Sequence, residues 1–206
     1  MIDNVLIFLY FSHLTIFWLY GLIWTLATDT KFHQESQQVA KYALKIQICI
    51  LPWCGLLFKH FYDPEYNEYI LQLPDFSLFE VFQFITMILY QDFMFYHIHR
   101  LFHLPQFYKF HKLHHTWSCP VPWESLYSSI PENILSNFLP VFSAPIIVRL
   151  KLFYLPLWVF LSTFSSLLAH SNYDFFHHTL HHRLHNVNYG TAGLFDIIYR
   201  TYKAKE

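Results

Sequence analysis

Long apolar stretches limit the folds open to this chain more than any other feature of the sequence. The first runs from Val5 to Ala27, about the 20 residues that a helix needs to cross a bilayer. Two more run from about Tyr42 to Phe61 and from about Leu78 to Ile98. Because backbone groups in lipid must pair within the protein and two-residue alternation is absent, the sequence predicts membrane-spanning helices.

The composition also indicates a membrane protein. Of the 206 residues, 54% are hydrophobic and only 13% are charged, whereas about a quarter are charged in an average soluble domain. The formal net charge of −1 provides no basic field for nucleic acid, so we expect no nucleic-acid partner. The three cysteines do not imply a disulfide framework of the secreted kind, because their number is odd and two lie in one apolar stretch.

A fourth apolar region, Ile134 to Ala169, is interrupted by prolines and by Arg149 and Lys151. This pattern predicts two shorter helices folded into a hairpin, which returns the chain to the side of the membrane that it left. The segment from His99 to Trp123 and the segment from His170 onward should therefore face one compartment.

The charges flanking the apolar stretches predict an orientation. The leader before Val5 carries Asp3 and no cation, so the first stretch is expected to be a membrane anchor and not a cleaved signal peptide. An acidic loop, Tyr62 to Phe76, separates the second and third stretches. The side of the membrane opposite this loop carries Lys31, Lys41 and Lys45. By the positive-inside tendency, that side is expected to be cytosolic. We expect an all-α integral membrane protein with about three spans plus a helical hairpin, and a cytosolic histidine-rich helical cap.

Fifteen histidines are present, and twelve of them fall in two windows, His97 to His115 and His170 to His185. His99 and His103 are four residues apart, and the spacing H-x-x-H-H occurs twice, at 111–115 and at 178–182. On a helix, positions i, i+3 and i+4 share one face, so each group could present its imidazoles to one point. Three pieces of helix could then surround one centre.

Imidazole is a good ligand for iron, zinc and copper, but about eight or nine donors are too many for one ion. The sequence therefore predicts a di-metal site. Redox-active iron fits better than structural zinc, because no cysteine lies at a ligand spacing from another. The residues of the paired boxes are the candidate ligands: His99, His103, His111, His114, His115, His178, His181 and His182.

Other polar residues near the boxes are candidates for supporting roles. His97 is expected to pack or to hold a ligand ring, and His177 and His185 to hold ligand rings by hydrogen bonds, with ligation as the alternative. Asp92 is costly inside a span and is expected to orient a ligand histidine, as Asp196 could. The isolated histidines are expected to be ordinary hydrogen-bonded residues: His13, His33 and His60.

The ordered motifs resemble the fatty acid hydroxylase and sterol desaturase superfamily. The resemblance covers roughly Asp92 to Thr201 and rests on Asp92-Phe-Met-Phe-Tyr96-His-Ile-His99-Arg100-Leu-Phe-His103, the two H-x-x-H-H boxes, Asn186-Val-Asn188-Tyr189-Gly190, Phe195-Asp196 and Arg200-Thr201. It implies a multi-pass enzyme of the endoplasmic reticulum membrane with a di-iron centre facing the cytosol. Cytochrome b5 and its NAD(P)H reductase would supply the electrons.

The same resemblance divides the chain into N-terminal membrane spans, 1–91, and a catalytic region, 92–206. It implies that the paired-box histidines are ligands and adds His170, which opens a further box. That box often reads H-x-x-x-H, and its second position here is Asp174, so either a carboxylate ligates or one ligand is missing. Family members often have an acidic residue at the position of Glu132, although a glutamate after Pro131 is also a common helix start.

We therefore expect an O2-dependent oxidoreductase that hydroxylates or desaturates a lipid, a sterol or a fatty acyl chain, and we favour hydroxylation of a sterol-like lipid. Zinc could replace the two iron ions during purification. Two alternatives stay open. A metal transporter would place its ligands near the bilayer midplane, whereas these boxes lie beyond the ends of the spans. An inactive scaffold relative is the other.

Overall fold

The computed structural model describes residues 2–27, 36–62, 68–118, 121–171 and 177–204, and it shows only helices and connecting turns in these ranges. The longer helices are α1 (Ile2–Ala27), α2 (Ser36–Cys49), α3 (Leu51–Phe61), α4 (Leu78–Phe102), α7 (Leu139–Val148) and α8 (Leu155–Ala169). The shorter ones are η2 (Glu68–Leu71), α5 (Tyr108–His111), η3 (His114–Thr116), η4 (Pro122–Leu126), α6 (Ile130–Glu132), η5 (Asn133–Phe138), η6 (Leu152–Tyr154), α9 (His178–Leu184) and α10 (Leu194–Ile198).

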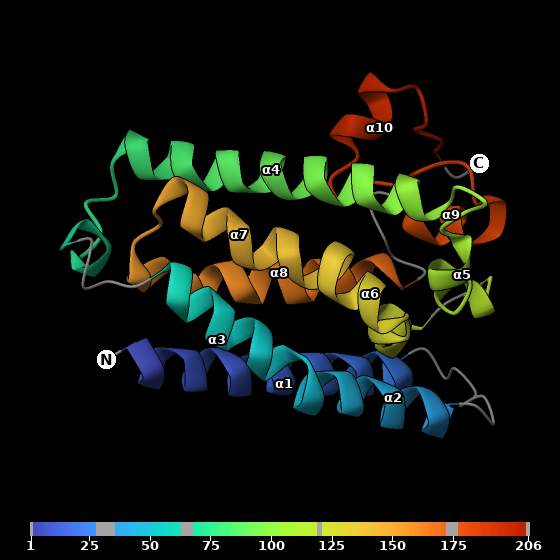
Figure 1. Ribbon diagram of the computed structural model, residues 1–206, viewed down its shortest axis with the longest axis horizontal. Helices are drawn as coiled ribbons and strands as arrows, with labels where there is room; N and C mark the ends of the chain where they lie inside the picture. The colour runs from blue at the N-terminus through green and yellow to red at the C-terminus, as the bar shows by residue number, and fades with distance from the viewer. Residues whose placement is uncertain (1, 28–35, 63–67, 119–120, 172–176, 205–206) are drawn as a thin grey trace.

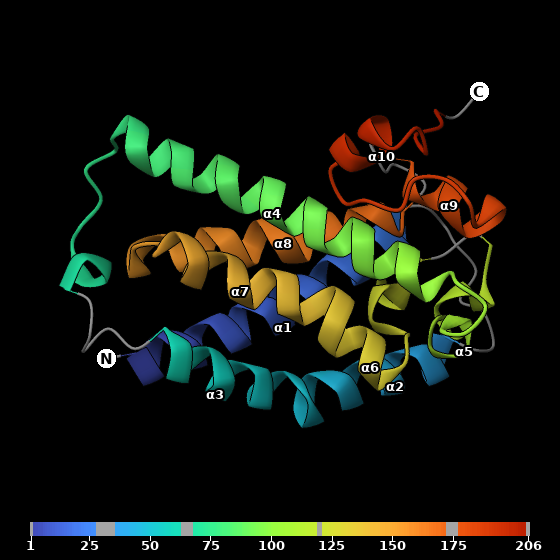
Figure 2. The same ribbon diagram turned by 45° about the horizontal axis from the view of Figure 1, so that its top comes forward.

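The longer helices run side by side along one axis, and α5 and α9 gather at one end of the bundle (Figures 1 and 2). Four segments are long and apolar enough to cross a bilayer: Ile2–Trp24, Gln37–Phe61, Leu78–Phe102 and Leu152–Ala169. The chain is thus an all-helical, multi-pass membrane protein, which confirms the predicted fold class. The second arm of the predicted hairpin is long enough to count as a span by itself.

Proline positions explain where the spans bend and turn. Pro52 lacks the N–H that would continue α2, so the second span is divided at Ile50 into α2 and α3. Pro156 lies in the first turn of α8. Pro140 directly follows the π-helix η5, within the continuous helical run from α6 to α7. Arg149 ends α7 in the left-handed conformation, with φ 53°, and begins the tight turn into α8.

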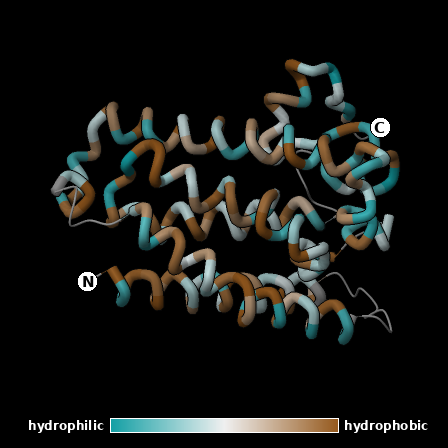
Figure 3. Tube along the Cα trace, in the orientation of Figure 1, coloured by the Kyte–Doolittle hydropathy of each residue, from teal (hydrophilic) through white to brown (hydrophobic). Residues whose placement is uncertain are grey.

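Two hydrophobic cores fill the bundle, one in each half. Phe58, Met87 and Trp158 belong to the core at the end where α1 begins, which we call the far end. Phe17 and Trp123 belong to the core in the other half, which we call the histidine end. Hydrophobic colouring runs along the longer helices, and hydrophilic colouring is concentrated near α5 and α9 (Figure 3).

The far end is closed by a buried lysine at the start of α8. The Nζ atom of Lys151 lies 2.9 Å from an oxygen of Glu80 in the first turn of α4 and 2.9 Å from Asp75 Oδ2. The hydroxyl of Tyr154 donates to the other Glu80 oxygen over 2.8 Å. Glu80 also completes a capping box with Ser77. These contacts join the hairpin turn to the beginning of α4.

Candidate metal centre

Nine histidines converge at the histidine end from five pieces of chain, and they form two groups. In each group the ligand atoms all lie within 4.8 Å of one another. The five-histidine cluster consists of His99, His103, His111, His115 and His181. The four-histidine cluster consists of His114, His170, His178 and His182. The structure thus brings together the nine predicted ligands, as two neighbouring groups.

Each H-x-x-H-H box contributes to both clusters, and in the second box, which lies on α9, the helical rotation explains the division. On an ideal helix of 3.6 residues per turn, the i+4 side chain points within about 40° of residue i, whereas i+3 lies about 60° away on the other side. His178 and His182 accordingly enter the four-histidine cluster, and His181 enters the other. The expectation that each box would face a single point is corrected in this respect.

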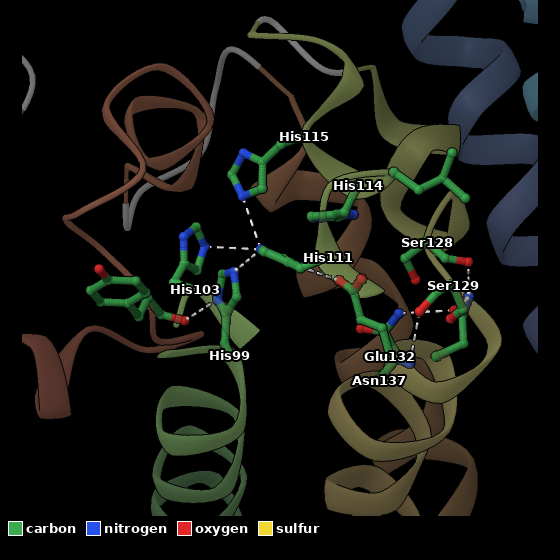
Figure 4. A network of polar contacts seen from close by, with 12 residues as sticks. His99, His103, His111, His114, His115, Ser128, Ser129, Glu132 and Asn137 are labelled. Carbon is green, nitrogen blue, oxygen red and sulfur yellow. Dashed lines mark hydrogen bonds and ion pairs between the residues drawn. The ribbon is translucent and has the colours of Figure 1, made fainter. Parts of the chain in front are cut away.

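In the five-histidine cluster the Nε2 atoms face one another. His111 Nε2 lies 3.0 Å from His99 Nε2, 2.9 Å from His103 Nε2 and 2.9 Å from His115 Nε2. His181 Nε2 lies 3.1 Å from His103 Nε2 and 3.0 Å from His115 Nε2. Figure 4 shows four of these rings turned toward a common point.

Backbone carbonyls fix which nitrogen of each ring carries the proton. His99 donates its Nδ1–H to the Tyr189 carbonyl over 2.8 Å, and His181 donates to the Val187 carbonyl over 2.7 Å. A carbonyl oxygen only accepts hydrogen bonds, so in both neutral rings the proton is on Nδ1, and Nε2 carries a free lone pair. Converging lone pairs repel one another unless a cation lies between them, so the cluster has the donor chemistry of a metal site.

The four-histidine cluster follows the same rule. His170 donates its Nδ1–H to the Ser166 carbonyl over 2.8 Å, and His182 donates to the Trp117 carbonyl over 3.2 Å. His178 hydrogen-bonds to the backbone of Asn188. Nε2 of His178 and of His182 is buried and has no hydrogen-bond partner among the described residues. Buried polar atoms without partners are rare, and a metal ion would satisfy both of these.

Burial keeps the rings uncharged, as ligation requires. It is the largest cause that lowers the pKa of His103 to about 4, that of His115 to about 2 and that of His178 to about 4. Neighbouring imidazoles lower the pKa of His103 and His115 further, because two cations so close would repel each other. Neutral imidazole is a ligand of iron and zinc, so these residues fit two metal ions.

Glu132 holds one ligand ring from the opposite side. Its Oε1 atom lies 2.8 Å from His111 Nδ1, and its side chain is only 4% exposed (Figure 4). Burial raises the pKa of this carboxyl, whereas a cation bound at His111 would favour its ionised form. The backbone N–H of Glu132 also donates to the Ser129 hydroxyl at the start of α6. Both roles that the sequence left open, helix start and acidic partner, therefore hold.

Asp92 and Asp196 hold the loop that supplies the Tyr189 carbonyl. Asp92 Oδ1 accepts from the backbone N–H groups of Thr191 and Ala192, over 2.7 and 2.8 Å. Asp196 accepts from the backbone N–H groups of Tyr189 and Gly190, over 2.8 and 2.7 Å. Asp92 Oδ2 also accepts from the Phe195 N–H, and Asp196 Oδ1 also accepts from the Thr201 hydroxyl. Neither carboxylate has a described hydrogen bond to His99, so their effect on that ring is indirect.

Gly190 lies close to both of these carboxylates. A Cβ atom added there would lie 2.5 Å from Asp92 Oδ1 and 2.9 Å from Asp196 Oδ2. Sequence reasoning missed the loop carbonyls, because a backbone acceptor leaves no side-chain signal. In the sequence, Gly190 was the one residue that could have indicated this close approach of the loop to the two aspartates.

The remaining predicted residues lie at different distances from the clusters. His97 contacts the Phe93 carbonyl of its own helix and the Tyr199 hydroxyl, so it packs against α10. The ring of His185 lies 4.4 Å from that of His115 between centroids. His177 begins α9, and its ring lies 6.0 Å from that of Tyr202. None of the three belongs to either cluster of described residues. Asp174 lies outside the described residues.

A cavity of about 120 Å³ lies beside the clusters. His99, His114, His170 and His178 contribute to its wall, together with residues of α1, α3, α4, α6, η5, α7 and α8. A second cavity, of about 450 Å³, lies toward the far end and is almost wholly apolar. Leu51, Val141, Phe142 and Val159 line both cavities. The interior therefore offers space for an apolar molecule next to the candidate metal centre.

Comparison with protein families places these residues within one known group. The model of the fatty acid hydroxylase family matches residues 84–201, a range that includes the nine clustered histidines, Glu132, Asp92 and Asp196. No solved structure matches the chain significantly.

Curated relatives from three kingdoms resemble the chain over part of their length. Fatty acid hydroxylase domain-containing protein 2 of Homo sapiens is 33% identical over 147 residues, which cover 67% of this chain and 40% of that protein. Delta(7)-sterol 5(6)-desaturase ERG3A of Gibberella zeae is 35% identical over 141 residues, 62% of this chain and 40% of that protein. Methylsterol monooxygenase 1-2 of Arabidopsis thaliana is 32% identical over 96 residues, 46% of this chain and 32% of that protein.

Proposed function

Because the chain belongs to the fatty acid hydroxylase family, we propose that it is a membrane-bound di-iron oxygenase that hydroxylates or desaturates a lipid with molecular oxygen. The chain spans about 40% of the length of the first curated relatives that it matches, so activity and substrate are proposals for this protein. Relatives named as sterol desaturases and methylsterol monooxygenases favour a sterol-like substrate.

The observation that carries the proposal is the pair of adjacent histidine clusters. Five neutral imidazoles would hold one ion, and four would hold the other. Each ring would offer one nitrogen lone pair to its ion. Two irons bound there would supply the oxygen chemistry that breaks an unactivated C–H bond. Iron is preferred to zinc because neither described cysteine, Cys49 or Cys54, lies in either cluster.

The protein's own part is to place the substrate and to exclude water. The cavity beside His99 and His178 is lined by residues of the membrane-spanning helices, so a lipid carbon could lie next to the metal ions. Phe95 and Phe138 are in its wall, and apolar walls keep bulk water from the reaction. The Glu132–His111 contact and the carbonyls of Tyr189 and Val187 hold the ligand rings in position.

We propose that the histidine end faces the cytosol and that the membrane is that of the endoplasmic reticulum. Lys41 and Lys45 lie on the helix α2 near this end, in agreement with the positive-inside tendency. Exposed cations surround the clusters: Arg100, Lys109, Lys112 and Arg183. Such a surface suits an acidic electron donor, for which a cytochrome b5-type protein is our candidate.

Lipid mass spectrometry under oxygen-18 gas tests the proposal. Cells expressing the wild-type protein are compared with cells expressing a His181→Ala/His182→Ala variant, which removes one ligand from each cluster. The matched control is His60→Ala, because His60 is exposed and belongs to neither cluster.

A lipid carrying labelled hydroxyl oxygen in wild-type and control cells only would establish hydroxylation. Loss of two hydrogens without label, in the same cells only, would establish desaturation. Equal lipid profiles in all three strains would contradict the oxygenase and favour a scaffold. Zinc uptake into sealed vesicles by iron-free protein would favour a transporter.

A further inference from the structure

Several polar side chains line the cavity beside the clusters, although most of its wall is apolar. His13, Thr163, Ser162, Ser136, Asn137 and Glu132 contribute to its wall. Most of these side chains already have partners within the protein. His13 Nδ1 lies 2.9 Å from Thr163 Oγ1, and Asn137 donates to Asn133 Oδ1 over 3.0 Å. As predicted from the sequence, His13 is an ordinary hydrogen-bonded histidine.

Two atoms in this wall have no partner among the described residues: Ser136 Oγ and Glu132 Oε2. Both residues are only 3% exposed. Polar atoms buried at this depth are almost always hydrogen-bonded in proteins, so these two point to a ligand that supplies the missing contacts. They come from neighbouring turns of one helical segment and line the same cavity.

The backbone between them is also unusual. Residues Asn133–Phe138 form a π-helix, which widens one turn between α6 and α7. Wide turns of this kind occur frequently at functional sites, because the inserted residue changes the direction in which side chains point. Ser136 lies within this turn, and Glu132 immediately precedes it. The π-helix is therefore a second, independent feature of the same place.

The chemistry of the two atoms limits what can bind. A hydroxyl group donates one hydrogen bond and accepts others, so it can donate to Glu132 Oε2 and accept from the Ser136 hydroxyl. A carboxylate would bring an anion to an acidic residue. A charged headgroup would also be costly to bury, whereas an uncharged hydroxyl is not once it is hydrogen-bonded.

We propose that Ser136 and Glu132 bind a hydroxyl group of the lipid substrate and thereby select hydroxyl-bearing lipids. The inference rests on the proposed function only in calling the ligand a substrate. The apolar part of the lipid would occupy the 450 Å³ cavity. This cavity shares four wall residues with the 120 Å³ cavity: Leu51, Val141, Phe142 and Val159. The hydroxyl then anchors the molecule beside Glu132, which also contacts the ligand ring of His111.

A binding experiment on the purified full chain tests this proposal without turnover. Four deuterated probes are added in detergent micelles as two matched pairs: cholesterol with cholestane, and 1-hexadecanol with hexadecane. Lipid retained after desalting is measured by mass spectrometry. The variants are Ser136→Ala and, as a matched control, Ser143→Ala, because Ser143 lies on α7 outside both cavity walls and bonds to Leu139 and Tyr90.

We expect the hydroxyl member of at least one pair to be retained about fivefold better by the wild type and by Ser143→Ala, roughly the worth of one hydrogen bond. Ser136→Ala should show a smaller preference, because only the Glu132 contact remains, and should keep its metal content. Equal retention within both pairs by the wild type would overturn the proposal, as would an unchanged preference in Ser136→Ala. A cavity that holds only water there gives the first of these results.

The two proposals fail separately. A hydroxyl preference that depends on Ser136, in a protein that makes no labelled lipid, would remove the oxygenase and leave the binding site. Labelled product from a protein that shows no preference would remove the binding site and leave the oxygenase.

Discussion

The two ends of the bundle treat their buried polar groups in opposite ways. At the far end, the fully buried Lys151 ammonium contacts two carboxylates and the Leu73 carbonyl, so charge and hydrogen bonds are balanced within the chain. At the histidine end, ring nitrogens of the nine clustered imidazoles face one another or have no described partner. The far end is complete as folded, whereas the histidine end has the donor chemistry of a metal site.

Because of this difference, we expect the far end to contribute mainly to the stability of the fold and the histidine end mainly to function. A buried ion pair stabilises the fold only while both partners are present, because losing one leaves an uncompensated charge. A set of facing lone pairs costs stability until metal binds, and the binding energy then contributes to folding. Changes at the far end should therefore alter stability, and changes at the histidine end should alter metal binding and activity.

Removing the metal should have the largest effect and should show the difference between the two ends most clearly. Chelation is expected to abolish turnover and to raise backbone hydrogen exchange at residues 99–116 and 178–190 by at least about tenfold, since local opening becomes easier. Residues 148–154 should exchange as before. Hydrogen-exchange mass spectrometry in detergent measures both regions, and an equal rise at both ends would contradict the comparison.

Glu132→Gln should have the next largest effect. The amide cannot supply a carboxylate charge to His111, so we expect metal affinity to fall about 10- to 100-fold, as for other partners of ligand histidines. Competition with a metal-binding dye measures the affinity. Glu124→Gln is the matched control, because Glu124 is an equally buried glutamate that accepts from the Val121 N–H. Equal losses in both variants would indicate a purely structural role.

Lys151→Ala tests the far end and should change stability alone. It leaves Glu80 buried without its cation, so the unfolding temperature should fall more than in Tyr154→Phe, which removes one hydrogen bond worth about 1 kcal/mol. Thermal unfolding in micelles gives the order of the two variants. Metal bound per folded molecule should match the wild type, and a loss of metal in Lys151→Ala would show that the ends are coupled.

His97→Phe should have the smallest effect. The ring of His97 packs against Phe93, Phe195 and Tyr199 and is in neither cluster, so an aromatic ring of similar size should replace it. We expect full metal content and activity within about twofold of the wild type. Elemental analysis would reveal the contrary result, the loss of about one metal ion.

Much of the fold could be predicted from local sequence. Apolar runs set the spans, because a helix in lipid satisfies its backbone within one segment. Pro52 marks the break between α2 and α3, and Arg149 and Lys151 mark the hairpin turn. The π-helix at Asn133–Phe138 was not predicted, because apolar patterning over so few residues does not distinguish a π-helical turn from an α-helical one.

The candidate site was predicted in its members but not in its arrangement. Histidine spacing identified eight of the nine rings and suggested two ions, since one ion cannot take so many donors, and the family resemblance added His170. The tertiary structure decided that the adjacent residues His114 and His115 enter different clusters, as do His181 and His182. Neighbouring side chains on a helix point about 100° apart, and only the packing of α4, α8 and α9 sets what lies in each direction.

The sequence by itself determined that this protein is helical, lies in a membrane and carries a dense histidine set, because periodicity and spacing are local properties. Only the tertiary structure decided the division into five and four ligands, the Glu132 contact to His111 and the loop carbonyls that hold the rings. These depend on residues far apart in the chain meeting in space. Contacts of that kind are fixed by packing, which no single segment encodes.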